Sequence, residues 1–206
     1  MRYERKYRIT ASGYESVRHE LLSNPAAFSE AYPDRVVNSI YYDDINYTAY
    51  NDNLLGKADR VKYRVRWYGP SLDNIEQPIL EKKIKMSLLG TKEYKNLSKF
   101  SLNHSPPSLS DLYYSNQLYP HVLVRYLRTY LESMDGLLRA TIDRELNYYN
   151  LIDGRLTEQV YSDDAIILEI KYGQEDEAIA NSCMQAIPYR LTKNSKYVSA
   201  MQYYLQ

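Results

Sequence analysis

The chain has 206 residues, 26 basic and 26 acidic side chains, and a hydrophobic fraction of 44%. These values are typical of one folded domain, and they exclude a disordered chain and a strongly basic chain of the kind that binds nucleic acid through net charge. The single cysteine, Cys183, excludes an internal disulfide framework, and no apolar run reaches the roughly 18 residues of a membrane span. We therefore expect one cytoplasmic domain over residues 1–206.

The first half of the chain predicts strands separated by short helices. Alternating polarity or β-branched and aromatic residues indicate strands at 2–9, 36–44, 60–68 and 78–86. Residues 12–22 carry an apolar stripe at helical spacing, and Ser12 followed by Glu15 has the spacing of a capping box. The polar connector that follows residue 44 has room for one helical turn.

The second half predicts hairpins and two final helices. Irregular structure is expected around Pro106-Pro107, with Ser108 or Ser110 as a suitable cap for a short helix. Asp135-Gly136 and Asp153-Gly154 predict tight turns. The remaining elements are strands at 122–133, 137–146 and 165–173 and helices near 175–187 and 195–205. Many hairpin-linked strands with few helices indicate an α+β fold, in which an antiparallel β-barrel of about eight strands forms a tunnel with flanking helices.

The segment RVKYRVRWY, residues 60–68, separates charge from apolar bulk. At strand period, its four cations share one face, while Val61, Tyr63, Val65 and Trp67 share the other, which we expect to pack outward against the helices. A solvated outer face is the simplest interpretation of one such row. The cations in question are Arg60, Lys62, Arg64 and Arg66.

Other strands also carry cations on one face, whereas acidic residues gather in the expected turns and helices. The additional cations are Arg2, Lys6, Arg8, Lys83, Lys85, Arg128, Arg139 and Lys171. If these faces meet inside a barrel, each cation needs an anion beside it, because burying an unpaired charge is costly. A triphosphate or a polyphosphate chain supplies such anions, and the planar fork of arginine suits paired phosphate oxygens.

One acidic residue stands out among these charged rows. Glu169 shares its strand face with Ile167 and Lys171, so it is a candidate ligand of Mg²⁺ or Mn²⁺ together with phosphate oxygens. The alternative role for Glu169 is a salt bridge within the basic lumen.

Eight pieces in order resemble the catalytic domain of the vacuolar transporter chaperone (VTC) polyphosphate polymerases, members of the triphosphate tunnel metalloenzymes that also include the CYTH proteins. The resemblance runs from about residue 2 to residue 200. The pieces are YERKYRI, SIYYDD, VKYRVRWYG, LEKKIK, YLRTYL, RATIDREL, ILEIKYG and LTKNSKY.

This resemblance implies a tunnel that transfers the γ-phosphate of ATP to a growing polyphosphate chain with Mn²⁺ or Mg²⁺. The residues that match as catalytic cations are Lys6, Arg64, Arg66, Lys83, Arg128 and Arg139. Those that match as substrate-binding are Lys92, with Lys95 as its alternative, Lys193, Ser195 and Lys196, and Ser195 is also expected to cap the final helix. Glu169 matches the metal ligand.

Two rivals remain beside the polymerase: a triphosphatase or tripolyphosphatase of the same fold, and a non-catalytic polyphosphate sensor. Tunnel hydrolases begin with Glu-x-Glu-x-Lys, whereas Arg2, Glu4 and Lys6 occupy these positions here, which disfavours hydrolysis. The expected partners are ATP and polyphosphate, not nucleic acid. The SPX domain and membrane helices of eukaryotic polymerases do not occur in these 206 residues, and any membrane or protein partner is left open.

Overall fold

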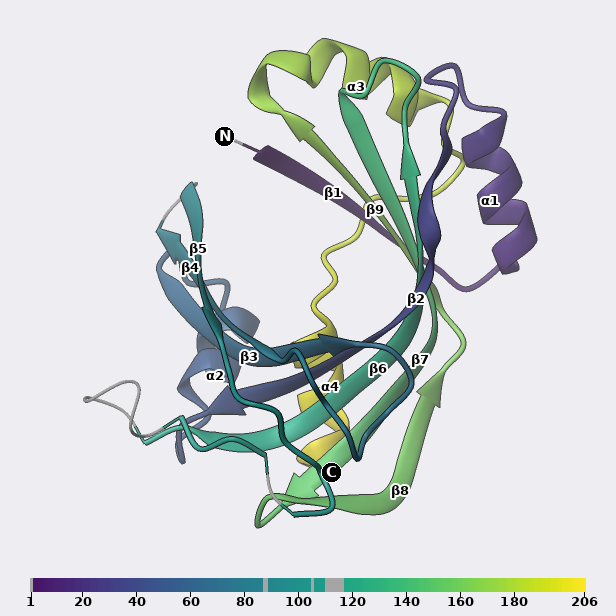
Figure 1. Ribbon diagram of the computed structural model, residues 1–206. Coiled ribbons are helices and arrows are strands. Elements are labelled where there is room, and N and C mark those ends of the chain that lie inside the picture. Colours follow the sequence, from purple (N-terminus) through teal and green to yellow (C-terminus); the bar gives the residue numbers. More distant parts are fainter. Residues whose placement is uncertain (1, 87–88, 105, 110–116) are drawn as a thin grey trace. The chain divides into compact units, whose positions relative to one another are not determined.

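The computed structural model describes residues 2–86, 89–104, 106–109 and 117–206. Its strands are β1 (Arg2–Ile9), β2 (Ser29–Asp43), β3 (Arg60–Tyr68), β4 (Ile79–Met86), β5 (Leu89–Asn96), β6 (Tyr119–Glu132), β7 (Leu138–Ile152), β8 (Arg155–Asp163) and β9 (Ile166–Gly173). The helices are α1 (Tyr14–Leu22), α2 (Thr48–Leu54), α3 (Glu177–Gln185), which follows the 3-10 turn η1 (Gln174–Asp176), and α4 (Lys196–Tyr204) (Figure 1).

The strands are paired in the order β1-β9-β7-β6-β2-β3-β4-β5, and β8 pairs with β7. The strand pairs β1–β9, β2–β3, β3–β4, β4–β5 and β7–β9 are antiparallel. The structure therefore confirms the α+β class and an antiparallel sheet of about eight strands with flanking helices. None of the helices in the described part of the chain has the length and apolarity that crossing a bilayer requires.

Three local predictions need correction. Strand β5, from Leu89 to Asn96, was not expected, because its exposed polar residues show no alternation with buried ones. The predicted capping box at Ser12 is wrong: Gly13 is the N-cap of α1, and no side chain caps this end. Ser108 lies in an irregular segment, and the alternative cap, Ser110, lies outside the described residues.

The hairpin turns are as predicted. Gly136 between β6 and β7 has φ of 72°, and Gly154 between β7 and β8 has the same value. This left-handed conformation favours glycine, which has no Cβ to clash with the backbone. The two Asp-Gly pairs therefore encode two consecutive reversals of the chain.

The chain divides into two compact units, which are described separately. The first unit comprises Met1–Arg35, Tyr126–Leu146 and Asp163–Asn194. Its core lies on one face of β1, β9 and the first part of β7, where Tyr7, Leu168 and Ile142 are buried. Helices α1 and α3 cover this face through side chains that include Leu21 and Cys183. The opposite face of the same strands is left for the polar residues.

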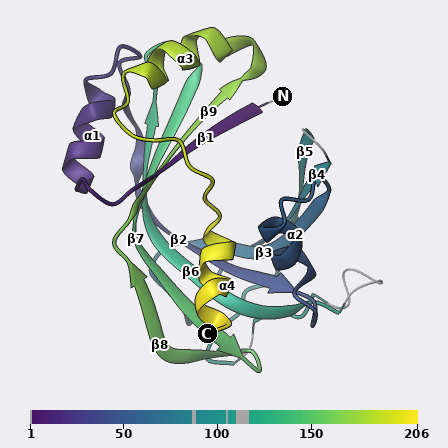
Figure 2. The ribbon, with the colours of Figure 1, turned by 180° about the vertical axis from the view of Figure 1, so that it is seen from behind.

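The second unit comprises Val36–Arg125, Asn147–Ser162 and Ser195–Gln206. Its core contains Val65 and Trp67 of β3, together with Leu80 and Leu102. For Trp67, the expectation of packing against helices is wrong: its indole contacts Phe100 and donates to the backbone oxygen of Ser71, so irregular segments cover it. Helix α2 lies beside α4 and β3 (Figure 2).

Candidate functional site

Strands β3, β4 and β5 of the second unit bring lysines into a row. Lys62 lies directly opposite Lys83, and Lys83 lies directly opposite Lys92, so one lysine from each strand faces the same side; we call these three the lysine row. Like charges in directly opposite positions destabilise a sheet unless anions or water compensate them. Lys95 is paired with buried Leu80 and faces the other side, which places Lys92 rather than Lys95 on the basic face.

Two arginines occupy the next positions of β3 on this face and share one carboxylate. Arg64 lies opposite Glu81 of β4 and forms an ion pair with its Oε2, at which Nε donates over 2.8 Å. The guanidinium of Arg66 lies 3.7 Å from Oε1 of Glu81, and its Nε donates to the hydroxyl of Ser39 at 3.1 Å. Both guanidinium groups are therefore held close to the lysine row by protein oxygen atoms.

The charges around Glu81 determine its protonation. Burial raises the pKa of this carboxyl, but the positive charges of Arg64 and Arg66 outweigh burial, so the pKa lies below its ordinary value of 4.5. The same cations, with Lys196, hold the pKa of buried Tyr41 below its ordinary value although burial raises it. The cations of this face thus favour the ionised form of both side chains.

The lowered pKa of Glu81 predicts a loss of stability in acid. A carboxyl whose pKa is lower in the folded state stabilises the fold above its unfolded-state pKa, and this contribution is lost as the pH falls from near 4.5 through the folded-state pKa. We expect wild type to lose more unfolding free energy than Glu81→Gln between about pH 7 and about pH 3. Urea unfolding at both pH values measures this difference, and equal losses would contradict it.

The N-terminus of α4 joins the basic face of the second unit. Ser195 is the N-cap, as predicted; its hydroxyl accepts from the backbone N–H of Val198 at 3.4 Å and from Nζ of Lys62 at 3.0 Å. The next residue, Lys196, is buried. The ring of Tyr197 stacks on Tyr41 with centroids 5.1 Å apart.

Asp43 fixes the start of α4 against α2. The hydroxyl of Tyr197 donates to Oδ2 of Asp43 at 2.5 Å, and the same carboxylate accepts from the backbone N–H groups of Ala49 and Tyr50. Asp43 is fully enclosed, so these donors replace the water that the carboxylate would otherwise bind. This contact sets the position of Ser195 and Lys196.

In the first unit, Glu169 lies among cations. Lys6 is directly opposite Glu169 in the β1–β9 pair, and its Nζ is 3.3 Å from Oε1; Lys171 Nζ is 3.2 Å from Oε2. The carboxylate of Glu4 approaches the same two ammonium groups at 3.6 and 3.5 Å. The salt-bridge interpretation of Glu169 therefore describes this structure, and Glu4 and Glu169 converge on one small volume.

Arg128 is an enclosed cation of the first unit, with 11% of its side chain exposed. It forms two bonds with Asp143, from Nε at 2.5 Å and from Nη2 at 2.7 Å, and Nη2 also lies 3.9 Å from Oε2 of Glu169. Asp143 is completely buried. Although burial lowers the pKa of Arg128, the charge of Asp143 outweighs it and raises the pKa well above the ordinary value. Asp143 therefore fixes the direction of this guanidinium.

Two residues that the sequence predicted to bind phosphate lie apart from the charged group around Glu169. Arg139 is 62% exposed in its side chain and forms its ion pair with Glu132 at 3.1 Å. Lys193 is exposed, although its neighbours contact β1: the backbone N–H of Thr192 donates to Lys6 O, and Lys6 Nζ donates to Asn194 O at 3.5 Å. Arg139 and Lys193 thus face solvent, whereas Lys6, Arg128 and Glu169 lie together.

The carboxylates of the first unit fit a divalent cation that shares its coordination with phosphate. Mg²⁺ sites of this kind use one or two carboxylates, with phosphates and water as the other ligands, and Glu4 and Glu169 supply two converging carboxylates. Within the described ranges, no group of three or more His, Cys, Asp or Glu side chains is arranged for a metal, so phosphate oxygens are needed to complete the shell.

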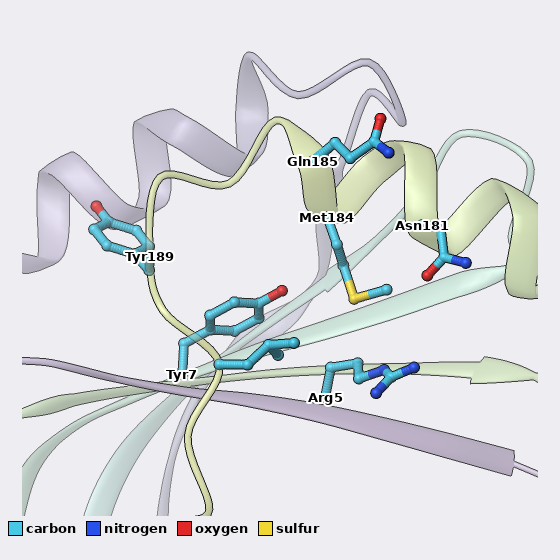
Figure 3. A pocket seen from close by; sticks show the side chains of 7 residues that line it. Arg5, Tyr7, Asn181, Met184, Gln185 and Tyr189 are labelled. Atoms are coloured by element: carbon cyan, nitrogen blue, oxygen red, sulfur yellow. The ribbon is translucent and has the colours of Figure 1, made fainter.

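A separate pocket lies on the other side of β1. It has a volume of about 450 Å³ and is lined by Arg5, Tyr7 and residues of α3 and the segment that follows it, among them Met184 (Figure 3). Because Arg5 and Tyr7 alternate with Lys6 along the strand, this pocket faces away from Glu169. Arg5 is already engaged, since its Nε donates to the hydroxyl of Tyr172.

Several residues that support the basic face of the second unit and the charged group around Glu169 in the first unit were not expected from the sequence. Tyr41, Asp43 and Tyr197 support the basic face of the second unit, and Asp143 supports Arg128. The sequence gives a signal for Asp143: it shares a strand face with Arg139 and Thr141, and a carboxylate on a face that carries cations is a candidate partner for one of them. Tyr41 and Tyr197 carry none, since they are 2 of 24 tyrosines.

Comparisons with known proteins give a family and a fold. The family model described as the VTC domain matches residues 1–109 and 102–205. No curated protein matches the chain. Among solved structures, HpAC1 from Hippeastrum, assigned as an adenylyl cyclase and described as having a dominant triphosphatase activity, has a TM-score of 0.58 and 12% identity, covering 98% of this chain and 96% of its own.

Two further solved structures have the same level of similarity. The PH1819 protein from Pyrococcus horikoshii OT3 has a TM-score of 0.53 and 12% identity, covering 99% of both chains. A protein from Vibrio parahaemolyticus assigned as an adenylate cyclase has a TM-score of 0.54 and 12% identity, covering 98% of this chain and 97% of its own. At this identity the likeness establishes the fold.

Proposed function

Because this chain belongs to the VTC domain family, we propose that it is a polyphosphate polymerase, which transfers the γ-phosphate of ATP to a growing polyphosphate chain. The observation that carries the proposal is the lysine row, in which Lys62, Lys83 and Lys92 lie directly opposite one another beside Arg64 and Arg66. A linear polyanion with a charge on every phosphate compensates such a row, because phosphate oxygens accept from each ammonium group in turn.

The chain's own groups bind and orient phosphate. Protein oxygen atoms orient both guanidinium groups before a ligand arrives: Glu81 and Tyr41 hold Arg64, and Glu81 and Ser39 hold Arg66. Preorganised donors of this kind stabilise charge that develops in a transition state without reorganising. In phosphoryl transfer this electrostatic term and the alignment of the reactants account for most of the catalysis.

The proposed reaction needs no nucleophilic side chain. The terminal phosphate of the acceptor chain is already an anion and attacks the γ-phosphorus of ATP, and ADP leaves with the electron pair of the broken P–O bond. A Ser-His-Asp or Cys-His arrangement is therefore unnecessary. The task of the protein is to hold two anionic reactants close together against their mutual repulsion, which the lysines and arginines perform.

Glu169, together with Glu4, is the proposed ligand of a divalent cation, Mn²⁺ or Mg²⁺, which when bound supplies neutralisation of charge on the phosphates. Lys6 and Lys171 lie within ion-pair distance of the Glu169 carboxylate, on its Oε1 and Oε2 sides respectively. Arg128, directed by Asp143, is the proposed phosphate donor nearest to this carboxylate.

Product analysis tests the polymerase. The pure protein is incubated with ATP and Mn²⁺, and the products are separated by size. We expect ADP together with phosphate chains longer than a triphosphate. ADP without such chains would contradict the proposal.

A triphosphatase of the same fold is the second candidate, favoured by the triphosphatase activity described for HpAC1, whose fold this chain shares. It would release inorganic phosphate from ATP or from tripolyphosphate with the same cations. Stoichiometric release of inorganic phosphate with no chain growth identifies the triphosphatase. Tripolyphosphate binding without turnover, for every combination of metal and nucleotide, identifies instead a polyphosphate sensor.

Glu169→Gln is expected to lower turnover by at least about 100-fold, because the variant loses the charged ligand that the cation requires. Tripolyphosphate binding without metal should survive or strengthen, since a negative charge is removed from a basic cluster. Calorimetry measures this binding. Glu30→Gln is the matched control, because Glu30 is exposed and paired with Arg18. Equal turnover in Glu169→Gln and wild type would exclude Glu169 as the metal ligand.

A further inference from the structure

Thr141 of β7 has a buried hydroxyl that forms no hydrogen bond in the described part of the chain. The residue is 8% exposed, and its oxygen is enclosed by protein. An enclosed hydroxyl without a partner costs free energy, because it has given up its bonds to water. Native proteins rarely keep such a group, so its presence calls for a physical reason.

The register places this hydroxyl beside the proposed metal ligand. Thr141 lies directly opposite Glu169 in the β7–β9 pair, so the two side chains leave the sheet on the same face. Along β7, Thr141 is followed two residues later by Asp143, which binds Arg128. Thr141 therefore shares a sheet face with Glu169 and with Asp143, the partner of Arg128.

Glu169 does not use this neighbour because both of its oxygens face cations. Oε1 lies 3.3 Å from Lys6 Nζ, and Oε2 lies 3.2 Å from Lys171 Nζ. The side chains of Lys6 and Lys171 are 24% and 37% exposed, so their ammonium groups can turn toward an incoming phosphate. Once they do, the carboxylate loses the two ammonium groups nearest to it, while Arg128 Nη2 stays at 3.9 Å from Oε2.

We propose that Thr141 is a positioning residue for Glu169: with phosphate and the divalent cation both bound, the lysines turn to the phosphate, and the Thr141 hydroxyl donates to one carboxylate oxygen and leaves the other directed at the cation. This inference rests on the proposed function, because it assumes that phosphate and metal bind at this cluster. Carboxylates that bind metals are themselves usually held by a hydrogen bond from a neighbouring group. The Thr141 hydroxyl is then a donor that forms its hydrogen bond only in the ligand-bound state.

Thr141→Val tests the inference, because it removes the hydroxyl and preserves the shape of the side chain, and Thr141→Ser restores the hydroxyl. Binding of Mn²⁺ is measured by calorimetry in the presence of tripolyphosphate, and tripolyphosphate binding is measured alone. We expect Thr141→Val to weaken Mn²⁺ binding by about 10-fold, the range typical of such supporting groups. Thr141→Ser should stay close to wild type, and tripolyphosphate binding without metal should be unchanged in both variants.

Thermal unfolding of the ligand-free protein is the second measurement. Since the hydroxyl has no hydrogen-bond partner among the residues that the structure describes, Thr141→Val should keep or raise the melting temperature. Three results would overturn the inference: unchanged Mn²⁺ binding in Thr141→Val, an equal loss in Thr141→Ser, or a lowered melting temperature with weaker metal-free binding. If wild type itself binds no Mn²⁺ with tripolyphosphate, the proposed function fails as well, which separates the two cases.

Discussion

Arg64→Ala and Arg66→Ala are each expected to weaken tripolyphosphate binding by about 10- to 100-fold, the effect of losing a charge-assisted hydrogen bond. Either variant leaves Glu81 with the other arginine, so the buried carboxylate keeps a counter-charge. The fold should therefore survive. Calorimetric titration with tripolyphosphate measures the affinity, and circular dichroism confirms the fold.

Lys82→Ala is the matched control for charge. Lys82 lies on β4 beside Glu81, but it faces the opposite side of the strand and pairs with Glu93 at 3.3 Å. Its loss lowers the net charge by the same amount as the loss of an arginine. Equal weakening in Lys82→Ala and Arg66→Ala would show that net charge, and not the basic face, binds the anion. A large loss of thermal stability in Arg64→Ala or Arg66→Ala would assign these arginines to the fold.

Asp143→Asn is expected to reduce the free energy of unfolding by about 3–5 kcal/mol, because it leaves the enclosed guanidinium of Arg128 without its carboxylate. Asp143 is completely buried, and the side chain of Arg128 is 11% exposed, so water cannot replace the lost partner. Chemical denaturation of wild type and variant measures the difference. A loss under about 1 kcal/mol, the value of an exposed ion pair, would contradict the enclosed pair.

A double variant separates the stability of this pair from its function. Apolar side chains of similar volume often replace a buried ion pair without loss, so Arg128→Met with Asp143→Leu should be more stable than Asp143→Asn alone. The same double variant should bind tripolyphosphate at least about 10-fold more weakly, because a directed guanidinium is gone. Wild-type affinity in the double variant would remove Arg128 from the proposed site.

Periodicity in the sequence located most of the strands because it depends only on neighbouring residues. The alternation in residues 60–68 gave β3 with its observed bounds, and both Asp-Gly pairs marked turns with positive φ. Strand β5 escaped detection because an exposed strand has no buried face to produce alternation. The same strand carries Lys92, so the choice between Lys92 and Lys95 required the observed register.

The sequence could not predict which charged side chains form ion pairs, because these pairs join residues that are distant along the chain. Arg128 and Arg139 are alike in the sequence, yet one is enclosed by Asp143 and the other extends to exposed Glu132. Glu81 is one of several acids in the strands, and only the pairing of β3 with β4 places it against Arg64. A shift of one residue in that register would have sent Glu81 to the apolar face.

The sequence by itself determined the α+β class, the one-sided distribution of cations along the strands and the resemblance to the VTC family, because each is a local or linear pattern. The tertiary structure alone decided that Lys62, Lys83 and Lys92 form a row, that Glu169 lies between Lys6 and Lys171, and that the Thr141 hydroxyl has no partner among the described residues. The physical reason is that cross-strand register and burial arise from pairing between distant segments, which fixes the distance between charges.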